Sequence, residues 1–200
     1  MMILRSVPPS PFGRKVRIGA ALAGLADEID IVAADTNDPA DTLLQQNPLG
    51  KIPVLVLEDQ TCIFDSRVIL EYFDQRAGGN CLIPSEPGAR IAALSQAALA
   101  DGVLDACILQ IYETRYRQPD KHDAQWVARQ AEKVSRSLVA FAADRPAGRR
   151  DVAHIGLACA LGYLDLRFAG LWRQDFPGLV AWLDAFAADV PAFAATRVVA

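Results

Sequence analysis

Residues 2–24 read MILRSVPPSPFGRKVRIGAALAG and decide the fold of the first half of this 200-residue chain. Residues 2–7 are rich in strand-forming side chains, and the prolines that follow forbid regular structure. Ser10 and Pro11 then suit the N-cap and the first position of a helix, and Gly24 suits its end. A strand that runs into a helix start presents a hydroxyl beside unpaired backbone N–H groups, which predicts a binding site there.

The segments that follow predict a small sheet. Residues 28–34 have strand character, so the chain begins with a strand, a helix and a strand, an order that favours a parallel pair. The apolar run 53–57 is typical of a buried strand, and residues 62–64 return as its hairpin partner. A second helix starts at Asp65 and Ser66. The order β-α-β-β-β-α around one sheet is the thioredoxin-like layout.

The second part of the chain has a different composition. Residues 1–80 contain 8 Ala and residues 81–200 contain 26, whereas Val, Ile and Thr together number 16 in each part. Because Ala is the best helix former and β-branched residues favour strands, this division predicts an α/β half followed by an all-α half. We expect helices over residues 89–117, 124–143, 151–167 and 177–187. The predicted fold is an N-terminal thioredoxin-like domain over residues 1–78, followed by a C-terminal helical bundle over residues 87–200.

Charge and cysteine content exclude several classes of protein. The chain carries 20 Lys and Arg against 24 Asp and Glu, a net charge of −4, which is wrong for a protein that binds nucleic acid through bulk positive charge. The cysteines and histidines are scattered, without the clustering of a metal site: they are Cys62, Cys81, Cys107, Cys159, His122 and His154. Scattered thiols favour the reducing cytoplasm. We find no apolar run of the roughly 18 residues that a membrane span needs, so no membrane contact is expected.

Ser10-Pro11-Phe12-Gly13 stands where a thioredoxin-like redox protein carries Cys at the first and usually at the fourth position. Ser and Gly there exclude direct dithiol exchange by this motif and leave a hydroxyl at a helix start, which suits a thiolate or another anion. Lowering a thiol pKa from about 8.5 by about two units takes about 2.7 kcal/mol. A hydroxyl that donates to a thiolate supplies about 1.5–3 kcal/mol, and the helix terminus adds about 0.3–1 kcal/mol. The alternative is that Ser10 only caps its own helix.

Two further features describe a ligand. If the Ile52–Pro53 bond is cis, the backbone of Ile52 can pair with an extended peptide; the alternative is an ordinary trans Pro at a strand start. Asp65 offers an anion to an ammonium group, and Ser66, as the expected N-cap, starts a helix whose N–H groups suit a carboxylate; the alternative is a plain cap. With Ser10, these features define a ligand that has a thiol, an extended peptide unit and a free amino-acid head. Glutathione fits this description.

The motifs that carry these features resemble a known family. SPFGRKVR at residues 10–17, NPLGKIP at 47–53 and FDSRVILEY at 64–72 resemble the N-terminal domain of cytosolic glutathione transferases, most closely their bacterial branch with Ser or Cys at the active position. Later segments resemble that family's central buried helix and its closing helices: they are residues 151–167, 179–182 and 191–193. The resemblance covers nearly the whole chain.

The resemblance implies a role for each residue of the first half. Ser10 would activate the glutathione sulfur, and Ile52 would pair with the cysteinyl backbone across a cis Pro53. Asp65 and Ser66 would hold the γ-glutamyl head. Lys51 would reach the glycyl carboxylate. Glutathione would be a co-substrate, and the reaction would need no metal or other cofactor.

The chain departs from the family pattern at two positions. Asp65 is one methylene shorter than the Glu that is frequent there, so its carboxylate should contact the ligand amine less precisely. The buried helix of the family usually starts with Ser or Thr and has Asp three residues later, whereas this chain has Asp151 and His154. We therefore expect Asp151 to cap the helix without the reciprocal bond of a capping box.

In the helical half, the resemblance implies that Asp101 faces the glutathione amine of the partner subunit in a homodimer. The alternative is a solvated face, because Asp105 follows one turn later. Ile108, Tyr112 and Tyr116 recur along one predicted helix and are candidates for the pocket of the second substrate; the alternative is core or interface packing. The basic pairs are expected to be solvated charge: they are Arg14-Lys15 and Arg149-Arg150.

The function that the resemblance implies is a detoxifying transferase, in which a glutathione thiolate attacks a small apolar electrophile. One alternative is glutathione-dependent disulfide reduction on the same site. Another is a non-catalytic regulator of the stringent starvation protein type, although the joint presence of Ser10, Lys51, Asp65 and Ser66 argues against it.

Overall fold

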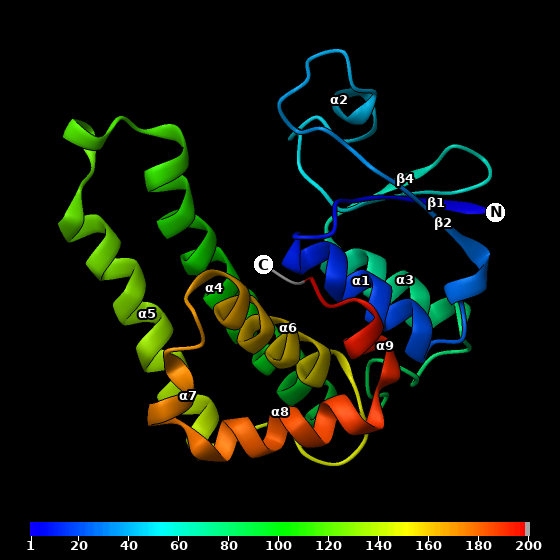
Figure 1. The fold of residues 1–200 in the computed structure, drawn as a ribbon. Helices are drawn as coiled ribbons and strands as arrows, with labels where there is room; N and C mark the ends of the chain where they lie inside the picture. Colours follow the sequence, from blue (N-terminus) through cyan, green and yellow to red (C-terminus); the bar gives the residue numbers. More distant parts are fainter. Residues whose placement is uncertain (199–200) are drawn as a thin grey trace. The chain divides into compact units, whose positions relative to one another are not determined.

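Four short strands form one mixed sheet in the order β2–β1–β3–β4 (Figure 1). Their bounds are Met2–Arg5 for β1, Ile29–Val32 for β2, Val54–Val56 for β3 and Cys62–Ile63 for β4. β1 pairs in parallel with β2 and antiparallel with β3, with Leu4 opposite Leu55, and β3 and β4 form the antiparallel hairpin. Each strand is shorter than the sequence predicted, but the strand order and pairing confirm the thioredoxin-like layout.

The structure, a computed structural model, describes residues 1–198 and divides into two compact units. The first unit contains Met1–Arg90 together with Val190–Val198, and the second contains Ile91–Asp189. Residues 190–198, which the sequence predicted to be part of the helical half, belong to the same unit as the sheet. All described residues of the second unit lie in helices or connecting segments, as predicted for an all-α half.

Two long helices of the first unit, α1 (Pro11–Leu22) and α3 (Ser66–Arg76), lie side by side (Figure 1). They approach so closely at Gly19 that a Cβ atom there would lie 2.1 Å from Cδ2 of Leu70. The backbone turns after α1 at Gly24, whose φ of +72° is the left-handed conformation expected just past a helix end. The remaining short elements are the 3₁₀ turn η1 (Ala26–Glu28) and the helix α2 (Leu43–Gln46).

The C-terminal segment adds a short helix, α9 (Pro191–Ala195), to the first unit, and Arg14 holds it. The Arg14 guanidinium donates to the backbone carbonyl of Phe193 at 2.6 Å and lies 4.0 Å above the ring of that residue. Its Nε donates to the hydroxyl of Thr196 at 3.2 Å. Arg14 and Lys15 are both buried, so the expectation of solvated charge was wrong for this pair. Both side chains lie on the packed side of α1, which their charge alone did not reveal.

The described residues of the second unit form four long helices and two short elements. These are α4 (Pro87–Tyr116, of which the first residues belong to the other unit), η2 (Pro119–Lys121), α5 (Ala124–Ala143), α6 (Val152–Arg167), α7 (Trp172–Asp175) and α8 (Pro177–Asp189). α6 is buried over most of its length. At Gly156 it lies so close to α4 that a Cβ atom would lie 3.1 Å from Cβ of Ala100. Small residues at such contacts explain why this half is rich in Ala.

The start of α6 differs from the sequence prediction. Asp151 caps the helix as expected, since its carboxylate accepts from the N–H groups of Ala153 at 3.0 Å and His154 at 3.2 Å. The reciprocal half that we expected to be lost is present, because Nδ1 of buried His154 lies 3.4 Å from the Asp151 N–H. The same Nδ1 lies 2.8 Å from the Asp151 carboxylate. Without a hydrogen, Nδ1 accepts from the Asp151 N–H and completes the capping box; with a hydrogen, it donates to the Asp151 carboxylate instead.

α4 also corrects an expectation about membranes. By length and composition this one helix could cross a membrane, whereas we found no such run in the sequence. In the structure, 44% of its most apolar stretch is buried, and residues such as Ala97 and Ala100 pack against α6. Core helices of globular proteins pass the same test of length and composition. The observed packing therefore accounts for part of its apolar character.

Candidate functional site

The junction between β1 and α1 places Ser10 at a helix N-terminus. Ser10 has an extended backbone, with φ −70° and ψ 116°, and Pro11 is the first helical residue. The Ser10 hydroxyl oxygen accepts from the backbone N–H of Gly13 at 3.1 Å, so Ser10 is the N-cap. A hydroxyl that accepts one hydrogen bond still has its own hydrogen to donate. Capping and donation to a ligand are therefore compatible at this residue.

Gly13 is required by close packing at this helix start. A Cβ atom on Gly13 would lie 1.9 Å from the hydroxyl oxygen of Ser6, just beyond β1. Ser6 is buried, and its hydroxyl has no hydrogen-bond partner among the described residues. The sequence indicated Gly13 only as the replacement for a redox Cys. It did not indicate Ser6, because no sequence pattern shows which side chain lies beneath a helix start.

Asn47 builds the turn that leads to β3. Its buried side-chain amide donates to the carbonyl of Lys51 at 2.8 Å, and its side-chain oxygen accepts from the N–H of Leu49 at 3.0 Å. The Lys51 side chain is exposed, and the Ile52–Pro53 bond is cis. The sheet ladder begins after these residues, at Val54 opposite Arg5. The turn was predicted, but the role of Asn47 in fixing the carbonyl of Lys51 was not.

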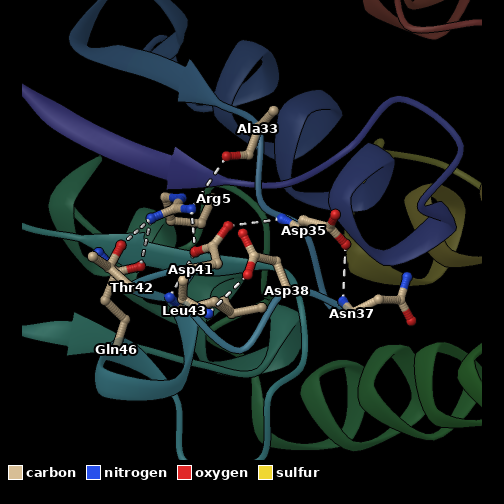
Figure 2. A network of polar contacts seen from close by, with 10 residues as sticks. Arg5, Ala33, Asp35, Asn37, Asp38, Asp41, Thr42, Leu43 and Gln46 are labelled. Carbon is tan, nitrogen blue, oxygen red and sulfur yellow. Dashed lines mark hydrogen bonds and ion pairs between the residues drawn. The ribbon is translucent and has the colours of Figure 1, made fainter.

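Arg5 connects the sheet to the segment that precedes this turn, as Figure 2 shows. Its guanidinium donates to the Asp41 carboxylate at 2.7 Å, the Thr42 hydroxyl at 2.7 Å, the Gln46 side chain at 3.1 Å and the Ala33 carbonyl at 3.2 Å. Hydrogen bonds from the backbone N–H groups of Asp35 and Leu43, with the nearby Arg5, hold the pKa of Asp41 below its ordinary value. A single Arg in a strand gives no sequence signal for such a network.

At the start of α3, Asp65 rather than Ser66 is the N-cap. The Asp65 carboxylate accepts from the N–H of Arg67 at 2.9 Å and pairs with the Arg67 guanidinium at 2.8 Å. The prediction that Ser66 is the cap was wrong, because Asp65 is the residue with the extended backbone and Ser66 is already helical. Burial acts to raise the pKa of Asp65, but the Arg67 hydrogen bonds and the charges of Arg67 and Lys15 outweigh it, so that pKa lies below its ordinary value.

Lys15 joins the N-terminal parts of α1 and α3. Its side chain is buried, with 1% of the residue exposed, and its Nζ lies 3.4 Å from the hydroxyl oxygen of buried Ser66. Nζ also lies 5.7 Å from the ring centre of Phe12. The structure thus brings a buried ammonium group close to Ser66 and Asp65. The sequence did not predict this contact.

The candidates of the helical half lie on α4. Tyr112 and Tyr116 are 44% and 57% exposed, and their rings meet edge to face at 5.0 Å, so the predicted shared face is real. Ile108 is half-buried one turn earlier. Asp101 is buried and Asp105 exposed, so the alternative of a solvated face fails for Asp101. Whether Asp101, Ile108, Tyr112 and Tyr116 contact ligands remains a prediction.

Cys107, on the same helix, is not a reactive thiol. Burial raises the pKa of Cys107 to about 12, so that the thiolate is absent near neutral pH. Because the thiolate is the nucleophilic form of Cys, this residue packs as a small apolar side chain. A protein thiol on α4 is therefore not the source of nucleophilic sulfur.

The first unit has a thioredoxin-like sheet, Ser at its first helix start and an acidic cap beside Ser66 at a later helix start, and the second unit is all-helical. Together these features define a class, proteins of the glutathione transferase type. Comparison with known proteins supports this assignment to a class. The glutathione S-transferase N-terminal domain matches residues 9–76, and the glutathione S-transferase C-terminal domain matches residues 124–185. The GST-like protein YibF of Escherichia coli K12 is 34% identical over 177 residues, which cover 86% of each chain.

Solved structures that are similar to this chain also belong to glutathione transferases. A glutathione transferase family member from Pseudomonas fluorescens Pf-5, with bound glutathione, is 42% identical over all of both chains, with a TM-score of 0.93. A structure of a family member from the same source, with bound S-(propanoic acid)-glutathione, is 41% identical over 98% of this chain and 99% of that one, with a TM-score of 0.88. The stringent starvation protein A homolog of Coxiella burnetii is 39% identical over 90 residues, which cover 45% of this chain and 42% of that one. The chain belongs to the glutathione S-transferase family.

Proposed function

We propose that the protein is a glutathione transferase in which the Ser10 hydroxyl stabilises the thiolate of bound glutathione. The observation that carries this proposal is the geometry of Ser10. Its oxygen accepts from the Gly13 N–H at 3.1 Å, which leaves the hydroxyl hydrogen for a ligand at the same helix N-terminus. The relative from Pseudomonas fluorescens with bound glutathione supports this choice of ligand.

The other glutathione contacts follow the family resemblance. In the proposal, Ile52 and Pro53 hold the cysteinyl backbone, and Lys51 approaches the glycyl carboxylate. Asp65 and Ser66 hold the γ-glutamyl head, with Asp65 sharing its carboxylate between the ligand amine and Arg67. Asp101 acts from the partner subunit of a homodimer. The protein works in the cytoplasm, with glutathione as co-substrate and no resident cofactor.

The second substrate in this proposal is a small electrophile. The glutathione sulfur forms a bond to carbon, and a leaving group such as chloride departs with the electron pair of the bond that breaks. Ile108, Tyr112 and Tyr116 would contact this substrate. Because a relative was crystallised with S-(propanoic acid)-glutathione, electrophiles that carry a carboxylate belong among the candidates.

Calorimetry and turnover test this function directly. We expect glutathione to bind the purified protein and an aryl halide to be conjugated faster than a mixed disulfide is reduced. The reverse order of rates would replace conjugation by disulfide reduction. A carboxylate-bearing electrophile in the same assay would show whether the substrate is charged.

A regulator of the stringent starvation type is the second candidate. The 39% identity to the Coxiella burnetii protein over 90 residues favours it. A non-catalytic regulator needs no thiol nucleophile. Absence of heat at millimolar glutathione, from a protein that is folded by circular dichroism, would favour the regulator over the transferase.

A further inference from the structure

The Arg5 guanidinium, at the end of β1, binds three positions around the short helix α2, as Figure 2 shows. Asp41 and Thr42 are the two residues before α2, and Gln46 is its last residue. The Arg5 and Asp41 side chains are largely buried, with 9% and 12% exposed. Replacing a buried ion pair by apolar groups of similar volume is often neutral for stability, whereas such a pair can specify one conformation. Arg5 is therefore suited to fix where α2 lies on the end of β1.

The same residue also pairs with the chain beyond the turn that follows α2. The backbone of Arg5 lies opposite Val54 in the ladder between β1 and β3. Gln46, whose side-chain oxygen accepts from the Arg5 guanidinium at 3.1 Å, is the last residue before the turn. Arg5 thus holds the chain on both sides of residues 47–53, on one side through its guanidinium and on the other through its backbone.

Within residues 47–53, Asn47 connects α2 to Lys51. The Asn47 N–H donates to the carbonyl of Leu43, in α2, at 2.7 Å, and its side-chain amide donates to the Lys51 carbonyl at 2.8 Å. The Lys51 backbone therefore takes its position from α2, whereas its side chain is exposed. A lysine ammonium is a point charge on a flexible stem, so where it can bind a carboxylate depends on where its backbone lies.

We propose that Arg5 is a positioning residue for the glycyl end of glutathione, and that it places Lys51 to bind the glycyl carboxylate. This inference rests on the proposed binding of glutathione and adds a residue that acts without contact to the ligand. Arg5 acts through Gln46 and Asn47, which place the Lys51 backbone. Loss of the Arg5 guanidinium should therefore lower selectivity for the glycyl carboxylate more than it lowers binding as a whole.

Two ligands test the proposal by calorimetry. Glutathione is compared with γ-glutamylcysteine N-methylamide, which lacks only the glycyl carboxylate. We expect the natural protein to bind glutathione about 5- to 10-fold more tightly, as one charge-assisted contact near the surface provides. Arg5→Met keeps a long unbranched side chain, and in this variant the ratio of the two affinities should fall to about twofold or less. This loss of selectivity would support the proposal.

A matched variant separates this role from a general one. Arg76→Met removes an arginine that pairs with Glu28 in the same unit, away from α2, and should leave the ratio unchanged. A similar fall of the ratio in Arg76→Met would overturn the proposal, because the effect would not be specific to Arg5. Equal weakening of both ligands by Arg5→Met would overturn the positioning role and leave the proposed function intact.

A milder variant keeps the test decisive if Arg5→Met does not fold. Gln46→Met removes the Arg5 acceptor nearest to the turn, so the ratio should fall there too, by a smaller factor. An unchanged ratio in folded Gln46→Met would then overturn the proposal, as would equal affinities of the natural protein for the two ligands. Absence of binding by either ligand to the natural protein would overturn the glutathione function itself.

Discussion

At the scale of single residues, hydrogen-bond direction determines what each polar group can do. Ser10 accepts from its own helix and Ser66 accepts from Lys15, so both hydroxyls have a hydrogen for a ligand. Ser10 was predictable, because Ser followed by Pro is a local signal of a helix start. Lys15 was not predictable, because its burial depends on how α1 packs against α3 and leaves no pattern in the neighbouring residues.

Gly13 gives a prediction at this scale. Gly13→Ala should lower the free energy of unfolding by about 1–3 kcal/mol, because the new Cβ atom would meet the Ser6 hydroxyl at 1.9 Å. The double variant with Ser6→Ala should recover most of that loss, since it removes the oxygen involved. Urea unfolding of the two single variants and the double variant measures this. Strictly additive effects would show that the two residues do not collide.

At the scale of elements, local signals predicted the order of strands and helices. They did not predict which hydrogen bonds and ion pairs fix the ends of these elements. Ser10, Pro11 and Gly24 marked the ends of α1 correctly. At α3, two adjacent residues were both good caps, and the backbone conformation favoured Asp65, which its sequence could not reveal. Networks such as that of Arg5 with Asp41 join residues far apart in the sequence, so no local pattern predicts them.

Asp74, near the end of α3, binds the segment that directly follows this helix and gives a prediction at this scale. Its buried carboxylate oxygen accepts from the N–H groups of Cys81 at 2.8 Å, Leu82 at 2.6 Å and Ile83 at 3.0 Å. Asp74→Ala leaves these donors without their acceptor and should lower the free energy of unfolding by about 3 kcal/mol or more. Asp74→Asn keeps a carbonyl oxygen in place and should cost clearly less. Chemical denaturation compares the two variants; an equal loss would mean that packing, not hydrogen bonding, dominates.

At the scale of the whole molecule, composition divided the chain correctly into a mixed half and a helical half, but the C-terminal segment does not follow this division. Residues 190–198 belong to the unit that contains the sheet. The contacts of Arg14 with Phe193 and Thr196 explain this, because they join positions about 180 residues apart. A composition count cannot detect a contact over that separation.

The contribution of Arg14 to the local stability of α9 can be measured. Arg14→Met removes a hydrogen bond to the Phe193 carbonyl, the bond to Thr196 and the cation over the Phe193 ring. Amide hydrogen exchange over residues 192–196 should become at least about tenfold faster, since a charged hydrogen bond contributes about 1.5–3 kcal/mol. Arg17→Met serves as the matched control on the same helix. Unchanged exchange in Arg14→Met would show that apolar contacts alone hold α9.

The central claim is that the Ser10 hydroxyl stabilises the glutathione thiolate, and a pH titration of the bound thiolate by ultraviolet absorbance tests it most directly. Removing a hydroxyl that donates about 1.5–3 kcal/mol to the thiolate should raise the ionisation pH by about one to two units in Ser10→Ala, while glutathione affinity below that pH changes little. Ser6→Ala deletes a buried hydroxyl nearby and should leave the titration unchanged. A Ser10→Ala titration that coincides with that of the natural protein would contradict the account.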